Sequence, residues 1–108
     1  MTTHLFQARY SAAAFKGMVT QPSDRQAAAS ALLAAMGLEL ISFYYVPGTS
    51  GIAGIIEGTT EHAATAGMAI CASGAFSSFE STEVLSNEQM NRAMKAAAEF
   101  AGKYQSPN

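Results

Sequence analysis

Four segments with the pattern of β-strands alternate with alanine-rich helical segments along this chain of 108 residues. In the first segment, Phe6, Ala8 and Tyr10 share one face, and the residues between them lie on the other. We expect strands over 4–10, 38–46, 52–57 and 76–85, and helices over 12–19, between Ser23 or Asp24 and Gly37, over 61–72, and after Ser86. The turn-forming cluster at 47–51 makes the second and third strands a hairpin.

This order of elements predicts an α+β fold. Two strand–helix–strand halves joined by a hairpin give the ferredoxin-like βαββαβ arrangement. We expect an antiparallel four-stranded sheet with helices on one face and an extra C-terminal helix. A single domain over 1–104 would be followed by a flexible tail over 105–108. The face of the sheet without helices would then need a partner or a ligand to cover it.

Residues that start or end helices mark the expected boundaries. Ser11 suits an N-cap, Pro22 interrupts the first helical stretch, and Gly37 ends the second. The last helix has the clearest start, because Ser86 and Gln89 match a capping box. Its expected buried stripe is Met90, Met94, Ala97, Ala101 and Tyr104, and the helix before it has a stripe of Ala64, Met68 and Ala72 with Cys71.

Alanine dominates the apolar residues, at 22 of the 108 positions. An alanine methyl buries little area, and burial stabilises by about 25 cal/mol per Å². A small core of this kind is commonly supplemented by association. Charged residues make up 13% of the chain, so little repulsion keeps copies apart. We therefore predict a homo-oligomer, and a dimer as its expected form, in preference to a monomer with a methionine-rich core.

Charge, hydropathy and cysteine content exclude several protein classes. Six Lys and Arg residues, scattered among eight Asp and Glu residues, cannot line a phosphate track, so we expect no nucleic-acid partner. No stretch of about 20 apolar residues is present, which argues against a membrane span. Residues 1–4 lack the pattern of a signal peptide. The single cysteine, Cys71, fits a reducing compartment, and we expect a cytoplasmic location.

The chain resembles the GYD domain, a family of small bacterial and archaeal proteins. The resemblance begins with the strand at 5–10, the serine after it, and the broken helix that ends at Gly37. It continues through an aromatic strand at 43–45, a turn that begins with glycine at 48, and an apolar strand that ends in an acid at 52–57. A short Thr-Glu-Thr-like strand at 79–81 and a Ser-capped acidic helix start at 86–88 complete the pattern.

The chain departs from the family at the Gly-Tyr-Asp signature. Gly48 matches, but Ser50 stands in place of the tyrosine and Gly51 in place of the aspartate. GYD domains resemble the wider dimeric α/β-barrel group, which includes cofactor-free monooxygenases, haem-handling enzymes and lyases. The resemblance therefore implies a fold and an oligomer more than a reaction.

Arg9, Tyr44, Gly54 and Glu80 are the candidate ligand-binding residues. The first and last strands of a ferredoxin-like sheet are neighbours, so Arg9 and Glu80 could meet across them, with Gln7, either as a site or as a structural ion pair. Tyr44 or its neighbour would offer a phenol hydroxyl. Gly54 leaves a gap in an apolar strand, which a ligand or a closely packed helix could fill.

The remaining residues with chemical potential favour structural roles. His62, in the first turn of a helix, would tend to be neutral, but no second residue has ligand spacing, so we expect a surface histidine and no metal. Cys71 is expected to be a small buried filler. The glycine-containing loop at 48–51 lacks a P-loop lysine and precedes a strand, so it is a hairpin turn. We expect no cofactor.

Three functions remain open from the sequence. The leading hypothesis is an oligomer that binds a mostly apolar small molecule between sheet and helices or at the subunit interface, oriented by Arg9, Tyr44 and Glu80. The second is a cofactor-free oxygenase or isomerase with Glu80 or His62 as its base. The third is a structural or regulatory interaction module in which another subunit fills the open face of the sheet.

Overall fold

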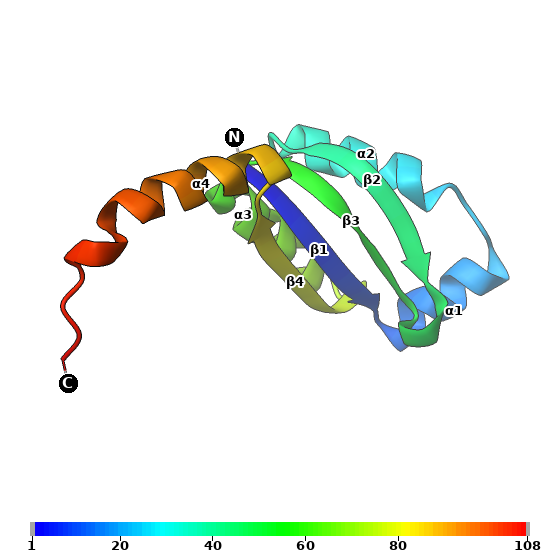
Figure 1. The fold of residues 1–108 in the computed structure, drawn as a ribbon. Helices are drawn as coiled ribbons and strands as arrows, with labels where there is room; N and C mark the ends of the chain where they lie inside the picture. Colours follow the sequence, from blue (N-terminus) through cyan, green and yellow to red (C-terminus); the bar gives the residue numbers. More distant parts are fainter. Residues whose placement is uncertain (1, 108) are drawn as a thin grey trace.

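The computed structural model describes residues 2–107, in which strands and helices follow one another in the expected order (Figure 1). The elements are β1 (Thr2–Tyr10), α1 (Ala12–Thr20), α2 (Arg25–Ala35), β2 (Glu39–Val46), β3 (Gly51–Gly58), α3 (Thr60–Ala72), β4 (Phe76–Val84) and α4 (Asn87–Phe100), with short 3-10 helices η1 (Pro47–Thr49) and η2 (Ala101–Lys103). Every strand begins and ends within two residues of its predicted range. Of the predicted tail, 105–107 are exposed and without regular structure, whereas Asn108, like Met1, lies outside the described residues.

The four strands form one antiparallel sheet in the order β2-β3-β1-β4. This is the ferredoxin-like arrangement and confirms the predicted fold class. Along the central pair, Phe6 of β1 lies opposite Gly54 of β3. The pairing of β2 with β3 shifts between Leu40 and Ser42, so that Ile41 is an extra residue in β2, as in a β-bulge.

The helix starts agree with the caps predicted at Ser11, Asp24 and Ser86, and Thr59 caps α3 in the same way. In each of the four α-helices a side-chain oxygen accepts a hydrogen bond from a backbone N–H three residues on: Ser11 from Ala14, Asp24 from Ala27, Thr59 from His62 and Ser86 from Gln89. The Gln89 side chain accepts the Ser86 N–H in return, at 2.8 Å, which completes the capping box. Gly37 follows α2 with φ +81°, a left-handed conformation that favours glycine.

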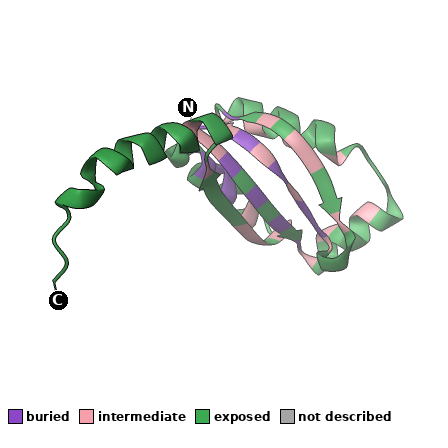
Figure 2. Ribbon diagram, in the orientation of Figure 1, coloured by how far each residue is buried: buried purple, intermediate pink, exposed green. Residues whose placement is uncertain are grey.

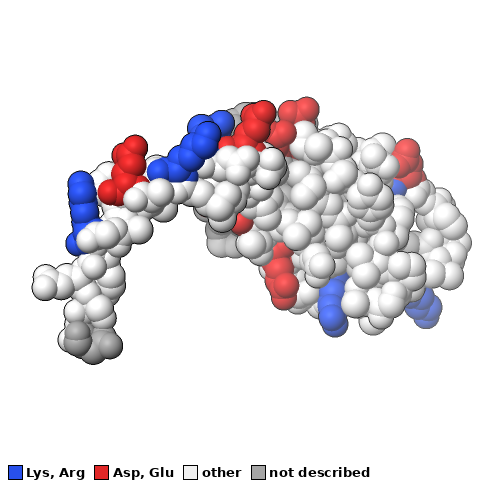
Figure 3. All heavy atoms as spheres, viewed as in Figure 1, with Lys and Arg blue, Asp and Glu red and all other residues white. Residues whose placement is uncertain are grey.

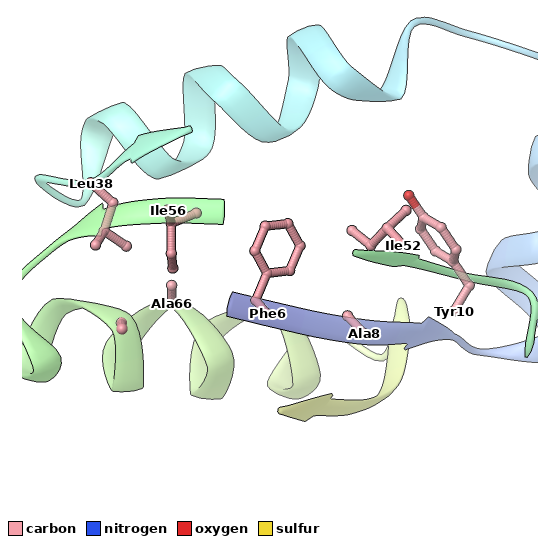
Figure 4. Close-up of a cluster of buried hydrophobic side chains, with 8 residues drawn as sticks. Phe6, Ala8, Tyr10, Leu38, Ile52, Ile56 and Ala66 are labelled. Atoms are coloured by element: carbon pink, nitrogen blue, oxygen red, sulfur yellow. The ribbon is translucent and has the colours of Figure 1, made fainter. Parts of the chain in front are cut away.

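Helices α2 and α3 lie on one side of the sheet, behind it in the view of Figure 1. The predicted alternation of β1 is confirmed, because its helix-facing residues are buried and the residues between them are exposed, as the banding of the strand shows (Figure 2). The core lies between the sheet and these helices (Figure 4) and consists of Phe6, Ala8, Tyr10, Leu38, Ile52, Ile56, Ala63 and Ala66.

The buried face of α3 is not the stripe that its sequence predicted. Its buried residues are Ala63, Ala66 and Gly67, whereas Met68 is 68% exposed. Ala64 and Ala72 are exposed as well, and Cys71 is half-buried rather than buried. The smallest side chains face the sheet because α3 packs closely there, so that a Cβ added at Gly67 would collide with the ring of Phe79 in β4.

Helix α4 does not bury the stripe predicted for it. Met90 is 47% exposed, Met94 50% and Tyr104 77%, and no residue of α4 is buried. The helix runs away from the sheet after β4 (Figure 1), which extends the molecule to 60 Å in its longest dimension. Its radius of gyration is 17.9 Å, against about 13 Å for a compact chain of this length. The stripe is apolar as predicted, but nothing within the described part of the chain covers it.

Candidate functional site

A cavity of about 90 Å³ lies between α2 and the sheet and is closed on one side by α3. We call it the central cavity. Its walls are almost wholly apolar: Phe6, Ile52, Ile56, Phe76 and Phe79 come from the strands, Ala28, Ala29, Leu32 and Leu33 from α2, and Ala66 and Ile70 from α3. The cavity exists because α2, which has no buried residue, does not pack closely enough on the sheet to fill the space beneath it.

Tyr10 and Arg25 supply the polar side chains of the central cavity. Tyr10, at the end of β1, is 8% exposed, and its ring stacks on that of Phe76 with 4.4 Å between the ring centroids. Figure 4 shows it on the same side of the sheet as Phe6 and Ile52. Burial raises the pKa of the Tyr10 phenol, and the hydrogen bond and positive charge of Arg25 act against that rise. The phenol is therefore a neutral hydroxyl at physiological pH.

Arg25 is the first residue of α2, and its Nε is buried without a hydrogen-bond partner among the described residues. The Asp24 carboxylate before it accepts the Ala27 N–H as the helix cap, at 3.0 Å. A buried donor without an acceptor is costly. Because Arg25 lines the central cavity, this unpaired N–H makes the Arg25 end of the cavity its polar end.

A second hollow of about 230 Å³ adjoins the central cavity at this polar end. Tyr10 and Arg25 line both spaces, and so stand at the boundary between them. The second hollow is more open and more polar, and Gln21 and Ser23 from the segment between α1 and α2 contribute to its wall. It gives the central cavity a polar approach from the solvent.

Three of the predicted site residues lie on the face of the sheet away from the helices, which we call the open face. Glu80 is opposite Gln7, Gln7 is opposite Ala53, and Ala53 is opposite Tyr44, so that one row crosses all four strands. Arg9 is two residues along β1, opposite Ser78, and is therefore a diagonal neighbour of Glu80. No ion pair joins Arg9 to Glu80 in the structure. These residues share a face, but it is not the face of the central cavity.

Gly54, the fourth predicted site residue, faces the helices. A Cβ at this position would collide with the backbone carbonyl of Ser42 and lie 2.9 Å from the ring of Phe6. The gap inferred from the sequence is thus filled by neighbouring protein atoms. Gly54 holds β2 and β3 close together, next to the cavity but outside its lining.

The open face presents a mostly uncharged surface (Figure 3). Leu5 is 43% exposed and Tyr44 67%, and charged side chains stand mainly toward the rim of this view. Arg9 and Glu80 belong to this surface together with Leu5, Gln7, Ser42, Tyr44, Ala53, Ile55, Glu57, Ser78, Thr82 and Val84. Exposed apolar area of this extent is a common mark of an interaction surface.

The histidines take structural positions. His62 is exposed, as predicted, and its ring lies against Gly37, where an added Cβ would be 2.8 Å from Nδ1. His4 is buried at 2% exposure, with Nε2 2.7 Å from the Thr2 hydroxyl, a role that its place at a strand start did not reveal. Within residues 2–107, no three His, Cys, Asp or Glu side chains gather as a metal site would require.

The loop between β2 and β3, which carries the departure from the GYD signature, closes the hairpin. Ser50 is left-handed at φ 54°, and its carbonyl accepts the Tyr10 N–H at 3.1 Å. A Cβ at Gly51 would collide with the carbonyl of Ala8, so the close approach of β1 and β3 leaves no room there for an aspartate. This loop is a turn, as predicted.

Sequence reasoning missed Arg25 and gave Tyr10 only a place on the same face of β1 as Phe6 and Ala8. An arginine directly after a helix-capping residue is usually expected to be solvent-exposed. Whether the Arg25 side chain points toward Tyr10 depends on how α2 crosses the sheet. The signal available in the sequence was the conjunction of a cation with an apolar helix face.

None of the helices in the described chain combines the length and hydropathy needed to cross a bilayer.

Comparison with known proteins gives one family match. The family model of the GYD domain matches residues 4–94, which cover β2, β3 and β4, β1 without its first two residues, and α4 as far as Met94. No similar protein was found among curated proteins, and none among solved structures. The match spans well over half of the chain and agrees with the order of elements in the fold. The chain therefore belongs to the GYD domain family.

Proposed function

We propose that this GYD-family protein binds a small, mostly apolar molecule in its central cavity, and that it does so as a homo-oligomer, with the dimer as the expected form. The observation that carries the proposal is the apolar lining of the central cavity, contributed by both layers of the fold. Apolar cavities stay dry, and they take up apolar guests that fit. At about 90 Å³ the space is smaller than the roughly 150 Å³ cavity known to hold benzene, so the guest is small or displaces α2 slightly.

Filling the central cavity tests the binding proposal. Ala29 of α2 lines the cavity and Ala31 on the same helix is exposed. Benzene should shift the methyl NMR signals of Ile52 and Ile56 in the wild type and in Ala31→Leu. Ala29→Leu should abolish those shifts, because its side chain occupies the space. Equal shifts in all three proteins, or none in the wild type, would argue against the cavity as a binding site.

Self-association through the open face follows from the exposed surface. The accessible area is 7428 Å², against about 5,700 Å² for a compact monomer of this mass. The excess is greater than the ~800 Å² that each partner buries in a standard interface. The exposed large apolar side chains include Leu5 and Tyr44 on the open face and Met90, Met94 and Tyr104 on the stripe of α4. We therefore expect a second copy to cover the open face, with the same surface of both subunits in an isologous interface.

A charge placed on the open face tests self-association. Leu5→Glu introduces a carboxylate at a site that is 43% exposed, and Met68→Glu does the same on the outer side of α3. We expect the wild type and Met68→Glu to sediment as a dimer and Leu5→Glu to dissociate to monomer, since burying an unpaired charge opposes association. A wild-type protein that stays monomeric at high concentration would contradict this arrangement.

Binding is favoured over catalysis because of where the candidate bases lie. Glu80 is on the open face, His62 is exposed with its ring against Gly37, and neither lines the central cavity. A base must lie within hydrogen-bond reach of the proton that it removes.

The half-buried free thiol of Cys71 supports a reducing location such as the cytoplasm as part of the same proposal.

A further inference from the structure

The chemistry of the ligand follows from the uneven distribution of polar groups around the central cavity, provided that the proposed binding function holds. Tyr10 and Arg25 are the polar residues of its lining, and both also border the second hollow. The cavity thus has an apolar interior and one polar end. A guest that fits such a space is amphipathic, with its polar group at the Tyr10–Arg25 end.

Arg25 sets the charge of that polar group. Its Nε is buried and unpaired, and neither the central cavity nor the second hollow is lined by an aspartate or a glutamate. The Asp24 carboxylate is engaged with the Ala27 N–H. The guanidinium therefore faces the cavity boundary with donor capacity and positive charge that no carboxylate of the lining balances. A guest bearing an anionic acceptor would satisfy both.

Tyr10 adds a second donor of fixed position. Its ring is held by stacking on Phe76, and its hydroxyl stays protonated because burial raises the pKa of the phenol. One guanidinium beside one neutral hydroxyl matches the two oxygens and single charge of a carboxylate. A phosphate monoester would bring up to two charges to a site with one cation, so the carboxylate fits better.

We propose that the central cavity takes a small monocarboxylic acid whose body is a single ring or a short branched chain, with the carboxylate bound by Arg25 and the Tyr10 hydroxyl. The small volume limits the body, so that a ring needs the slight displacement of α2, and the apolar lining from three strands and two helices excludes further polar groups on it. The second hollow, with Gln21 and Ser23 in its wall, leaves the carboxylate accessible to water.

Phenylacetate and phenylacetamide, which differ in charge but hardly in shape, test the proposal by calorimetric titration. Wild-type protein should bind the acid about tenfold more tightly than the amide, or better. Arg25→Gln should remove that preference, and Tyr10→Phe, which keeps the stacked ring, should reduce it. Arg92→Gln on the exposed face of α4 is the charge-matched control and should leave it unchanged.

Each contrary result has its own meaning. Equal affinity of the wild type for acid and amide overturns the carboxylate assignment while leaving cavity binding intact. Tighter binding of phenyl phosphate than of phenylacetate also overturns it. If acid, amide and benzene all fail to bind, the proposed function itself is wrong. If circular dichroism shows that Arg25→Gln does not fold, the comparison of acid with amide on the wild type decides alone.

Discussion

At the scale of single residues, Tyr10 combines a packed ring with a polar group at the edge of a cavity. The ring contributes to the core between sheet and helices, and the backbone N–H closes the β2–β3 turn through Ser50. The Tyr10 hydroxyl can therefore form hydrogen bonds with Arg25 and with a bound molecule. One residue thereby links the end of β1, the hairpin turn and the start of α2.

The pH dependence of stability should report on Tyr10. Burial raises the pKa of its phenol above the ordinary 10.0, so an unfolded chain loses that proton at a lower pH than the native protein. The contribution is fully present below about pH 10 and is lost as pH rises through the native pKa, because the unfolded state then binds fewer protons. Urea unfolding at pH 9 and pH 11 should show a smaller loss for Tyr10→Phe than for wild type.

The exposed Tyr104, at 77%, provides the control for that measurement. Tyr104→Phe should lose as much unfolding free energy between the two pH values as the wild type does. If Tyr10→Phe behaves in the same way as Tyr104→Phe, the buried phenol does not contribute to the alkaline decline.

Local sequence patterns could predict the faces of β1 but not the partners of its residues. Phe6, Ala8 and Tyr10 alternate, and a period of two fixes which face they share. Arg9 and Glu80 were correctly placed on neighbouring strands, but the sheet sets them diagonally and on the face away from the cavity. The pairing of Arg25 with Tyr10 was out of reach, because it depends on the angle at which a helix 15 residues later crosses the sheet.

At the scale of elements, the alanine-rich helices differ in how they meet the sheet. Helix α3 packs closely through Ala63, Ala66 and Gly67, whereas α2 has no buried residue and leaves the central cavity beneath it. The ends of these helices could be predicted from Ser, Thr, Asp and Gly residues with known capping chemistry. Their buried faces could not, because alanine on every side of α3 makes several stripes look alike.

The close packing of α3 should make Gly67 intolerant of a side chain. Alanine raises helix propensity by about 1 kcal/mol over glycine, but at Gly67 its Cβ would collide with the Phe79 ring, which is itself stacked on Phe6. We expect Gly67→Ala to lower the free energy of unfolding by about 1 kcal/mol or more. Chemical denaturation measures the change.

Gly17 in α1 is the matched control, because nothing lies within 4 Å of the Cβ that would be added there. Gly17→Ala should raise the free energy of unfolding by up to about 1 kcal/mol. If Gly67→Ala stabilised the protein as much as Gly17→Ala does, α3 would not lie so close to β4.

At the scale of the whole molecule, α4 sets the elongated shape. Its capping box defines its start, and its apolar stripe is real, but the stripe lies outside the fold of a single copy. The sequence could predict the helix and its amphipathic character. It could not predict the direction in which the helix leaves β4, because no residue of α4 is buried in the core and fixes that direction.

The stripe on α4 should matter for assembly and not for folding. Met94 lies on the stripe at 50% exposure, and Ala96 lies on the opposite side of the same helix. Met94→Glu should weaken the dimer in sedimentation equilibrium without changing the unfolding transition of the domain, since α4 contributes nothing to the core. Ala96→Glu adds the same charge and should do neither. Equal dimer strength in both variants would mean that α4 stays solvated in the assembly.

The irregularity in β2 also limits how copies of this chain can join. The outer strands of a sheet, here β2 and β4, present unpaired backbone groups onto which another chain could add a strand. The extra residue Ile41 disrupts the regular spacing of one such border, and Glu80 and Glu83 place exposed carboxylates along the other. Growth of a continuous intermolecular sheet, the route to fibrous aggregates, is thereby discouraged on both sides.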